Sequence, residues 1–231
     1  MNAKKLKSNR CLICDSPLYI LTDGQLIIDG LPVQYEVCEV CAFTRKVRRA
    51  FPSPEKEKRE YDFHENTLEN HNYVAMLERF LVQSVDPYKK HGSALDFGCG
   101  PGPVLAELLK RRGFHVQLYD PFYAPGLSVL NAQYDVVCAT EVIEHFHHPI
   151  QSFETLINCL KDDGILALMT KARPKRDEDF LAWWYRRDAT HVAFYTKTAL
   201  AHIARRFRLK TLQAHRDDIA VFKLDEEEHA R

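Results

Sequence analysis

The stretch Ala94-Leu-Asp-Phe-Gly-Cys-Gly-Pro-Gly-Pro103 decides the fold class of this 231-residue chain. It reads as a buried strand, a glycine-rich loop and the start of a helix, because Pro103 suits a first helical turn and an apolar stripe follows it at helical spacing. Gly98, Gly100 and Gly102 would let the backbone pass close to a ligand. A dinucleotide-binding loop would need glycine at position 103, so the spacing argues against NAD.

Strands and helices alternate along the chain around this loop. Beyond it we expect a strand over 115–119, a strand over 134–140, a helix over about 150–160, a strand over 165–170 and a closing hairpin over 209–216 and 219–224. This order predicts an α/β fold with a Rossmann-like, doubly wound, mostly parallel sheet closed by an antiparallel hairpin. Asp96, Asp120 and Glu141 map to the carboxyl ends of strands, where such sheets bind ligands.

Four of the seven cysteines form two Cys-x-x-Cys pairs, Cys11/Cys14 and Cys38/Cys41. Two such pairs complete a tetrahedral Cys₄ zinc site, and the short strands and the Asp-Gly turns between them predict a small zinc-ribbon-like module. Four thiolates leave no open coordination position, so the zinc would be structural. A redox pair and two disulfides are the alternatives. The first lacks a thioredoxin-like context, and the second is disfavoured in a reducing compartment.

The remaining cysteines and the segment that follows the module give less specific signals. Cys99, Cys138 and Cys159 lie in apolar stretches, which predicts small core residues rather than nucleophiles. We divide the chain into the module (1–50), a linker with an amphipathic helix (51–89) and the α/β domain (90–231). The basic residues of 44–60 alternate with acidic ones, so we expect a solvated linker.

Composition excludes several function classes. Hydrophobic residues make up 45% of the chain and charged residues 28%, as in a globular protein that fills a core. Lysine plus arginine and aspartate plus glutamate both number 32, so no global charge favours nucleic acid or a membrane surface. No apolar run is long enough to span a bilayer, and no export signal follows the basic start, which predicts a cytoplasmic protein without a membrane partner.

These motifs, in this order, resemble the class I S-adenosylmethionine-dependent methyltransferases. The resemblance rests on Leu-Asp-Phe-Gly-Cys-Gly-Pro-Gly from Leu95, on Asp120 and on Tyr-Asp-Val-Val-Cys-Ala-Thr-Glu-Val-Ile-Glu-His from Tyr134. It covers about residues 90–224 and is nearest to the group that includes the ubiquinone-biosynthesis type O-methyltransferases. The cysteine module also resembles ribbons found ahead of some sugar C-methyltransferases and an rRNA guanine methyltransferase group, without a match along the rest of the chain.

The resemblance implies S-adenosylmethionine as cofactor and places it on named residues. The glycine loop would pass beside the methionine part, and Asp120 would hold the ribose. The candidate cofactor-binding residues are Asp96, Phe97, Gly98, Cys99, Gly100, Gly102, Asp120, Pro121, Thr140 and Glu141. The chain departs from the family pattern between Asp120 and Asp135, which are too close to hold a third strand with its helices. Phe122, Tyr123 and Leu130 are therefore the candidates to pack on the adenine.

The acceptor side falls on Asp188-Ala-Thr-His-Val-Ala-Phe-Tyr195, after the last parallel strand. His191 is the candidate group that orients or deprotonates the acceptor, and Tyr195 the candidate hydrogen-bond donor; the alternative is that His191 only ties the segment to Asp188 or Glu141. The two share a face only if the segment is helical. Trp183 and Trp184 are equally core residues or substrate-stacking ones. His145, His147 and His148 form a cluster for which no carboxylate spacing supports a metal site.

The sequence thus predicts an enzyme, a methyltransferase acting on a small-molecule acceptor whose identity it does not give. One alternative is a zinc-ribbon interaction protein with a degraded cofactor domain, which the short third-strand region favours and the intact glycine loop disfavours. Another is an RNA methyltransferase. It would need a basic face, for which Arg45, Lys46, Arg48 and Arg49 are the candidates.

Overall fold

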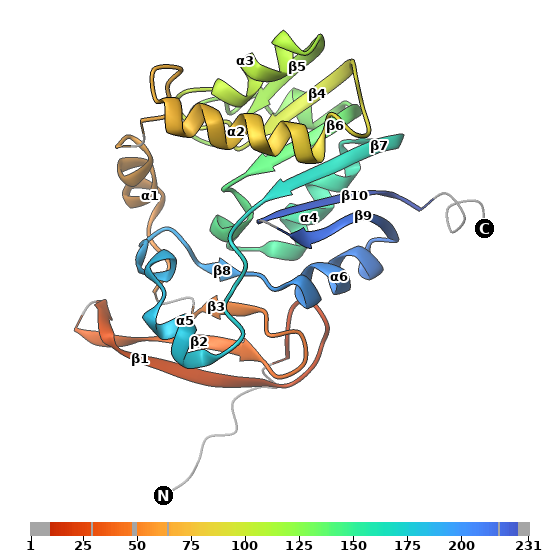
Figure 1. Ribbon diagram of the computed structural model, residues 1–231. Coiled ribbons are helices and arrows are strands. Elements are labelled where there is room, and N and C mark those ends of the chain that lie inside the picture. Colours follow the sequence, from red (N-terminus) through yellow and green to blue (C-terminus); the bar gives the residue numbers. More distant parts are fainter. Residues whose placement is uncertain (1–9, 29, 48–49, 64, 217, 226–231) are drawn as a thin grey trace, which may run out of the picture.

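The computed structural model describes residues 10–28, 30–47, 50–63, 65–216 and 218–225. The main body contains a six-stranded sheet in the order β5-β4-β6-β7-β10-β9, and a second, four-stranded sheet in the order β1-β2-β3-β8 lies beneath it in Figure 1. None of the helices in the described ranges is long and apolar enough to cross a bilayer.

The main sheet is the predicted doubly wound one. β4, β5, β6 and β7 are parallel, and β10 runs antiparallel to both β7 and β9. The strands are β4 (Gly92–Phe97), β5 (Phe114–Tyr119), β6 (Tyr134–Thr140), β7 (Leu160–Met169), β9 (Leu209–Arg216) and β10 (Ile219–Leu224). The central strands are buried along most of their length, as expected for near-continuous apolar runs covered on both faces.

Helices cover both faces of this sheet. Side chains from α2 and α3 form one core with β4, β6, β7 and β10, while those from α4 and α6 form the core on the opposite face. The helices are α2 (His71–Ser84), α3 (Val104–Arg111), α4 (Pro149–Asn158) and α6 (Lys197–Arg206). Local signals fix their starts: Asn70 and Thr196 each accept a hydrogen bond from the third residue of the helix that follows, and Pro149 opens α4.

The connection from β5 to β6 is as short as the sequence indicates. It contains an isolated bridge between Asp120 and Ala124 and the 3-10 helix η2 (Leu127–Asn131). In the described part of the chain no strand lies beyond β5, which is therefore an edge strand.

The cysteine module forms the second sheet with β1 (Leu18–Ile28), β2 (Leu31–Cys38) and β3 (Thr44–Lys46). Asp23-Gly24 does not form a hairpin turn, because β1 continues past it with a register shift between Asp23 and Ile27. Asp23 is buried inside the strand, where its Oδ1 accepts from the backbone N–H of Gln25 at 3.0 Å and of Leu26 at 3.3 Å. These two bonds provide an acceptor for N–H groups that are not paired with β2 at this point of the strand.

The segment expected to be a solvated linker is largely structured. It contains β3 and then α1 (Pro54–Tyr61), which Ser53 caps through its side chain. Lys46 is fully buried, and Arg45 lies 2.5 Å from the Glu36 carboxylate. These two side chains are therefore not available as a basic face, while Arg48 and Arg49 lie outside the described residues.

The path from β7 back to the main body runs through the module. After β7 come α5 (Asp177–Ala182), the 3-10 helix η4 (Trp184–Arg187) and then β8 (Ala193–Phe194), which pairs antiparallel with β3. The strand from the second half of the chain thus completes the sheet of the first, as Figure 1 shows for β8 and β3.

Candidate functional site

A cavity of about 690 Å³ opens at the carboxyl ends of β4, β5 and β6. This volume is within the usual range for a small-molecule site. One wall, here called the cofactor wall, consists of the glycine loop and the ends of these strands (97–101, 119–122 and 140–142). A second part of the lining, here called the acceptor wall, includes Tyr61, His145, Trp184, Tyr185, Asp188 and His191.

The glycine loop turns sharply after β4. Gly98 and Gly100 have φ angles of +77° and +63°, and the Gly98 N–H donates to Tyr119 O at 2.7 Å. A Cβ at Gly98 would clash with the Val142 side chain, and one at Gly102 would clash with the Asn66 carbonyl oxygen. Glycine is therefore required at these positions by conformation or by close approach, as the sequence indicates.

Asp120 is the acidic side chain at the end of β5. Its Oδ1 accepts from the N–H groups of Phe122 at 2.8 Å and Tyr123 at 3.1 Å, and its Oδ2 accepts from the Gly100 N–H at 3.1 Å. Asp120 is thus fixed between two loops and lines the cavity. Phe122 also lines it. Tyr123 instead bonds Asp62, and Leu130 packs against the core.

Three predicted cofactor residues support the loop without lining the cavity. Asp96 is buried below it with Oδ2 lacking a hydrogen-bond partner, and burial, reinforced by the nearby Asp120, raises the pKa of Asp96 to about 7. Cys99 is buried and Gly102 packs on Asn66. The other predicted residues, Phe97, Gly98, Gly100, Asp120, Pro121, Thr140 and Glu141, line the cavity.

The remaining isolated cysteines are core residues, as predicted. Cys99, Cys138 and Cys159 are all buried, and burial raises the pKa of the Cys99 thiol to about 12. A thiol that resists ionisation in this way is a poor nucleophile.

Glu141 is the residue at which the cofactor wall meets the acceptor wall. It directly follows β6 and adopts φ +53°, a conformation that few residues with a side chain take. Its backbone N–H donates to Met169 O at 2.8 Å, and its Oε2 accepts from the Tyr185 hydroxyl at 3.0 Å.

Tyr185 links two carboxyl groups. Its hydroxyl also contacts Oε1 of Glu144, which is fully buried. Burial, with the neighbouring Glu141, raises the pKa of Glu144 to about 8, and burial likewise raises the pKa of Glu141. One hydroxyl proton cannot satisfy both carboxylates at once, so the arrangement favours an additional proton held between Glu141 and Glu144.

His145 and His191 face each other across the acceptor wall with ring centroids 4.8 Å apart. The Nδ1 atom of His145 lies 3.1 Å from Thr190 O, and that of His191 lies 2.8 Å from Tyr185 O. A carbonyl oxygen only accepts, so each Nδ1 carries a proton, and in the neutral form of each ring the lone pair is on Nε2. Both histidines are therefore held in the tautomer suited to accept a proton or to bind a cation through Nε2.

Asp188 lies beside His191 on the same wall. Its Oδ2 is 3.8 Å from His191 Nε2, and its Oδ1 accepts from the Thr190 N–H at 2.8 Å and hydroxyl at 2.6 Å. Burial opposes ionisation, but His191 and the bonds from Thr190 outweigh it and lower the pKa of Asp188. An ionised Asp188 favours a positive charge on His191, the product of proton transfer to it.

Glu144, His145 and His191 form a group that could hold a metal ion. Each offers one ligand atom, and these atoms all lie within 4.8 Å of one another. The backbone carbonyls that orient the two rings are the kind of outer partner that metal-binding histidines use. The cluster differs from the His145/His147/His148 grouping considered from the sequence, because His147 Nε2 instead lies 2.8 Å from Glu57 Oε1.

Tyr195 does not reach this site, so its predicted role as hydrogen-bond donor to the acceptor is wrong. The residue is fully buried and packs between Phe43 and Phe153, with ring centroids 5.1 and 5.9 Å away. The chain between His191 and Tyr195 forms β8 rather than a helical turn. Tyr185, ten residues earlier in the chain, provides the hydroxyl in the cavity instead.

The two tryptophans have different surroundings. Trp184 lines the cavity and is 64% exposed, whereas Trp183 packs on Tyr185 and against the core of the module. Trp184 therefore has the location expected of a substrate-stacking residue, and Trp183 has that of a core residue.

The four module cysteines converge on one point. Their Sγ atoms all lie within 4.8 Å of one another, with Cys11 and Cys41 at 3.7 Å and Cys14 and Cys38 at 3.4 Å. Thiolates about 2.3 Å from a zinc ion at the centre of a tetrahedron are roughly 3.8 Å apart. The spacing therefore suits a Cys₄ metal site and is too long for disulfide bonds, in which the two sulfurs are about 2.05 Å apart.

The two Cys-x-x-Cys turns share one backbone conformation. In each, the residue after the second cysteine has a left-handed φ, +58° at Asp15 and +54° at Ala42, and its N–H donates to the carbonyl of the first cysteine. Backbone N–H groups also point at sulfur, from Ile13 to Cys11 and from Val40 and Cys41 to Cys38, each at 3.4 Å. Such donors stabilise thiolates, so the donor set fits a bound zinc ion.

The sequence did not indicate several residues of the acceptor wall. Tyr185 and Glu144 lie in segments that the sequence places near the site, but nothing in the spacing pairs them. Tyr61 comes from α1, which the sequence treats as linker. The Glu-His pair after β6 was the available signal, because both residues follow a strand whose carboxyl end borders the ligand edge.

Comparison with known proteins agrees with this geometry. No curated protein matches the sequence. A Burkholderia thailandensis 1,6-didemethyltoxoflavin-N1-methyltransferase, solved with S-adenosylhomocysteine, superposes with a TM-score of 0.54 at 12% identity, over 87% of this chain and 99% of its own. A possible histamine N-methyltransferase from Thermotoga maritima gives 0.46 at 13% identity, over 71% and 97%.

An O-methyltransferase from neocarzinostatin biosynthesis, in complex with S-adenosylmethionine and 2-hydroxy-5-methyl naphthoic acid, gives a TM-score of 0.48 at 13% identity, over 77% of this chain and 62% of its own. At 12% identity, the first of these structures supports the fold alone. The family is established by sequence, because residues 41–214 match a family model described as a methyltransferase domain. The chain therefore belongs to the class I S-adenosylmethionine-dependent methyltransferases.

Proposed function

We propose that this enzyme transfers the methyl group of S-adenosylmethionine to an N–H or O–H group of a small molecule bound beside His191. The observation that carries the proposal is the cavity with two chemically different walls. The cofactor wall offers backbone and one fixed carboxylate, while the acceptor wall offers two oriented imidazoles and a tyrosine hydroxyl.

The cofactor wall suits each part of S-adenosylmethionine. Asp120 can accept from two ribose hydroxyls, and the glycines allow the chain to approach the ligand closely. Asp96, buried beneath the loop with its pKa raised to about 7, would favour the cationic sulfonium and ammonium groups when it is ionised. Phe122 is the aromatic residue of the short β5–β6 connection that lines the cavity, so we assign the adenine contact to it.

Methyl transfer forms one bond between the acceptor atom and the methyl carbon as the bond from that carbon to sulfur breaks. The sulfur leaves with the electron pair, and an acceptor N–H or O–H loses its proton. His191 Nε2 is positioned to take that proton, and the ionised Asp188 then stabilises the imidazolium. The protein mainly has to align the reacting atoms and keep water out.

The Glu144, His145 and His191 group supports a second form of the same chemistry. A divalent cation bound there would lower the pKa of an acceptor hydroxyl that coordinates it. In that form His191 is a metal ligand rather than the base. Sensitivity of methyl transfer to a chelator that leaves the module's zinc bound would favour the cation, and insensitivity would favour the base.

We further propose that Cys11, Cys14, Cys38 and Cys41 hold one structural zinc ion. The common geometry of the two turns supports this, as does the convergence of the four sulfurs. We keep the division into the module (1–50), the linker with its helix (51–89) and the methyltransferase domain (90–231), with β8 of the third part joining the sheet of the first.

Neither alternative function gains support. A degraded cofactor domain would not need glycine at three close-packed positions or a cavity of ligand size. An RNA methyltransferase would need a basic face, and Arg45 and Lys46 are committed to internal contacts.

The test is calorimetry with S-adenosylhomocysteine. Wild type should bind it, Gly100→Val should block it, and Asp120→Ala should weaken it by ~1–3 kcal/mol through loss of hydrogen bonds to the ribose. Asp120 also holds its own loop in place. The affinity of Asp120→Asn, which keeps one acceptor oxygen, should therefore fall between those of wild type and Asp120→Ala. Asp162→Ala removes an exposed acid in β7 and serves as the control. Normal binding in both Gly100→Val and Asp120→Ala would place the cofactor elsewhere.

A further inference from the structure

The part of the acceptor wall that carries Trp184, Tyr185, Asp188 and His191 is attached to the cysteine module. Its histidine, His191, lies just before β8, the strand that pairs with β3 of the module through Thr44–Phe194 and Arg45–Ala193. Val192 is bonded on both sides: its N–H donates to Glu144 O, and its carbonyl accepts from the Lys46 N–H, both at 2.9 Å. The backbone at His191 is thus held between the site and the module.

Lys46 makes the most direct side-chain connection between the two. Its side chain is fully buried, and Nζ donates to Asp188 O at 2.7 Å and lies 3.5 Å from Ala189 O. These carbonyls belong to the turn that presents Asp188 and His191 to the cavity. A buried ammonium normally has a carboxylate partner; here Lys46 Nζ is hydrogen-bonded to main-chain oxygens, which fixes backbone rather than another side chain.

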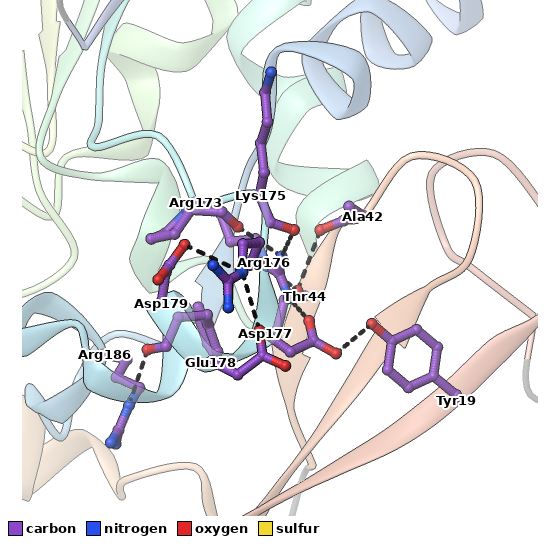
Figure 2. Close-up of polar contacts among 12 residues, drawn as sticks. Tyr19, Ala42, Thr44, Arg173, Lys175, Arg176, Asp177, Glu178, Asp179 and Arg186 are labelled. Carbon is purple, nitrogen blue, oxygen red and sulfur yellow. Dashed lines mark hydrogen bonds and ion pairs between the residues drawn. The ribbon is translucent and has the colours of Figure 1, made fainter.

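Further contacts hold the segments on either side of that turn. Arg186, next to Tyr185, forms a buried ion pair with Asp23 of β1. Figure 2 shows the contacts of Arg173, whose Nε donates to Thr44 Oγ1 at 3.0 Å while its guanidinium also binds Asp177. Tyr19 reaches the same carboxylate, with its hydroxyl donating to Asp177 at 2.8 Å.

The Cys38–Cys41 turn also contacts this part of the chain. The Thr196 hydroxyl donates to the carbonyl oxygen of Cys41 at 2.6 Å, and the same hydroxyl caps α6. An apolar cluster adds to the contact, because Phe180, Tyr185 and Phe194 pack with Val33, Tyr35 and Val37 of the module. All of these contacts reach residues 173–196, the part of the chain that carries Trp184, Tyr185, Asp188 and His191 of the acceptor wall.

We propose that the cysteine module positions the acceptor wall, and that Lys46 is the positioning residue through which it holds Asp188 and His191. The inference rests on the proposed binding of the acceptor beside His191. It assigns the two halves of the reaction to different parts of the chain, with cofactor binding set by the main sheet and acceptor alignment set by the module.

The test uses Lys46→Met, which keeps the apolar stem and removes the donor. The chain has two tryptophans: Trp184 lies on the acceptor wall, and Trp183 packs on Tyr185 and against the module, so tryptophan fluorescence reports on that wall and on its contact with the module. Hydrogen exchange at the amides of 188–192 should become about ten- to a hundredfold faster, since a charged hydrogen bond to the turn is lost. The ¹⁵N signals of the His191 ring should lose the signature of a fixed Nδ1–H tautomer.

The same variant should bind S-adenosylhomocysteine within threefold of wild type. Lys90→Met is the matched control, because Lys90 Nζ also donates to a backbone carbonyl, that of Asp86 at 2.6 Å, but far from the module. It should leave fluorescence, His191 signals and exchange at 188–192 unchanged. If Lys46→Met does not fold, Thr44→Val is measured in its place with the same expectations, because it removes the acceptor for Arg173 while keeping the side-chain shape.

Unchanged exchange and an unchanged His191 signature would overturn the proposal. Equal loss of cofactor affinity and of acceptor-wall order would also overturn it, because the module would then support the whole fold. Failure of the wild type to bind S-adenosylhomocysteine is a different outcome. It would contradict the proposed function and leave the effect of Lys46 on the wall to be read from exchange alone.

Discussion

The two walls of the cavity differ in how the chain forms them. The cofactor wall is made of backbone at the ends of adjacent parallel strands, and its key residues lie within a few positions of the strands that carry them. The acceptor wall is made of side chains from α1, the segment after β6 and the segment before β8. The first is local in sequence, whereas the second depends on contacts with a separate sheet. Variants should therefore damage one wall and leave the other.

The largest effect should follow from loss of the metal. We expect elemental analysis to find zinc in wild type purified without chelator, and Cys38→Ser/Cys41→Ser should abolish it. It should also remove most of the stability of the module, since structural zinc contributes roughly 10–16 kcal/mol of apparent binding free energy in small zinc units. Absence of zinc from freshly prepared wild type would defeat the assignment.

The same double variant sharpens the comparison of the two walls. Its tryptophan fluorescence should resemble that of a solvent-exposed segment, while calorimetry should still detect S-adenosylhomocysteine. Cys159→Ser, at a buried cysteine of the main core, is the control and should retain zinc.

His191→Ala should come next, once an acceptor is known. Removal of the proton acceptor should lower the rate of methyl transfer by ~10²–10⁴-fold, with cofactor affinity and melting temperature nearly unchanged. His147→Ala, which removes the partner of Glu57 on the same cavity, should have a much smaller effect on the rate. A large loss of stability with a normal rate at low temperature would show that His191 only ties the segment together.

A smaller effect on the cofactor wall concerns pH. The pKa of Asp96 is about 7, above its value in an unfolded chain, so the native state retains a proton that the unfolded state releases. The resulting stabilisation is complete at acidic pH and is lost as pH rises from about 4 to 7, with a slope of up to about 1.4 kcal/mol per pH unit. Denaturant unfolding at several pH values should show this slope, and Asp96→Asn should flatten it. An equal slope in the variant would exclude Asp96 as its source.

The smallest effect should be that of Tyr195→Phe. The Tyr195 hydroxyl is buried without a hydrogen-bond partner in the described chain, so its removal should leave stability unchanged or raise it by up to about 1 kcal/mol. Tyr185→Phe removes the hydroxyl between Glu141 and Glu144 and is the matched comparison. Thermal unfolding of the two variants separates them, and a strong loss of activity in Tyr195→Phe would contradict the reassignment.

The difference between the walls also explains what the sequence could predict. The strand, glycine loop and helix around Gly98, the acid at Asp120 and the closing hairpin all follow from local periodicity and turn chemistry, and the structure contains them where expected. Pairs of cysteines at fixed spacing likewise indicate the metal module.

Local pattern could not choose between Tyr185 and Tyr195. Both are aromatic residues in the same polar segment, and only the pairing of β8 with β3, more than a hundred residues apart in sequence, buries one and leaves the other in the cavity. Lys46 was misread for the same reason: a lysine in a charged stretch reads as solvated until the partner that buries it is known. Asp23 reads as a turn residue until Arg186 is placed beside it.

The left-handed backbone conformation of Glu141 lowers stability, while its side chain serves the site. A residue with a side chain in the left-handed region costs roughly 1–2 kcal/mol relative to an ordinary conformation, a cost that glycine does not carry. Directed evolution for heat resistance alone would be expected to accept glycine at this position. Selection for turnover would be expected to reject it, because the carboxylate that meets Tyr185 would be lost. A substitution by glycine at position 141 is thus expected to raise thermal stability and to abolish activity.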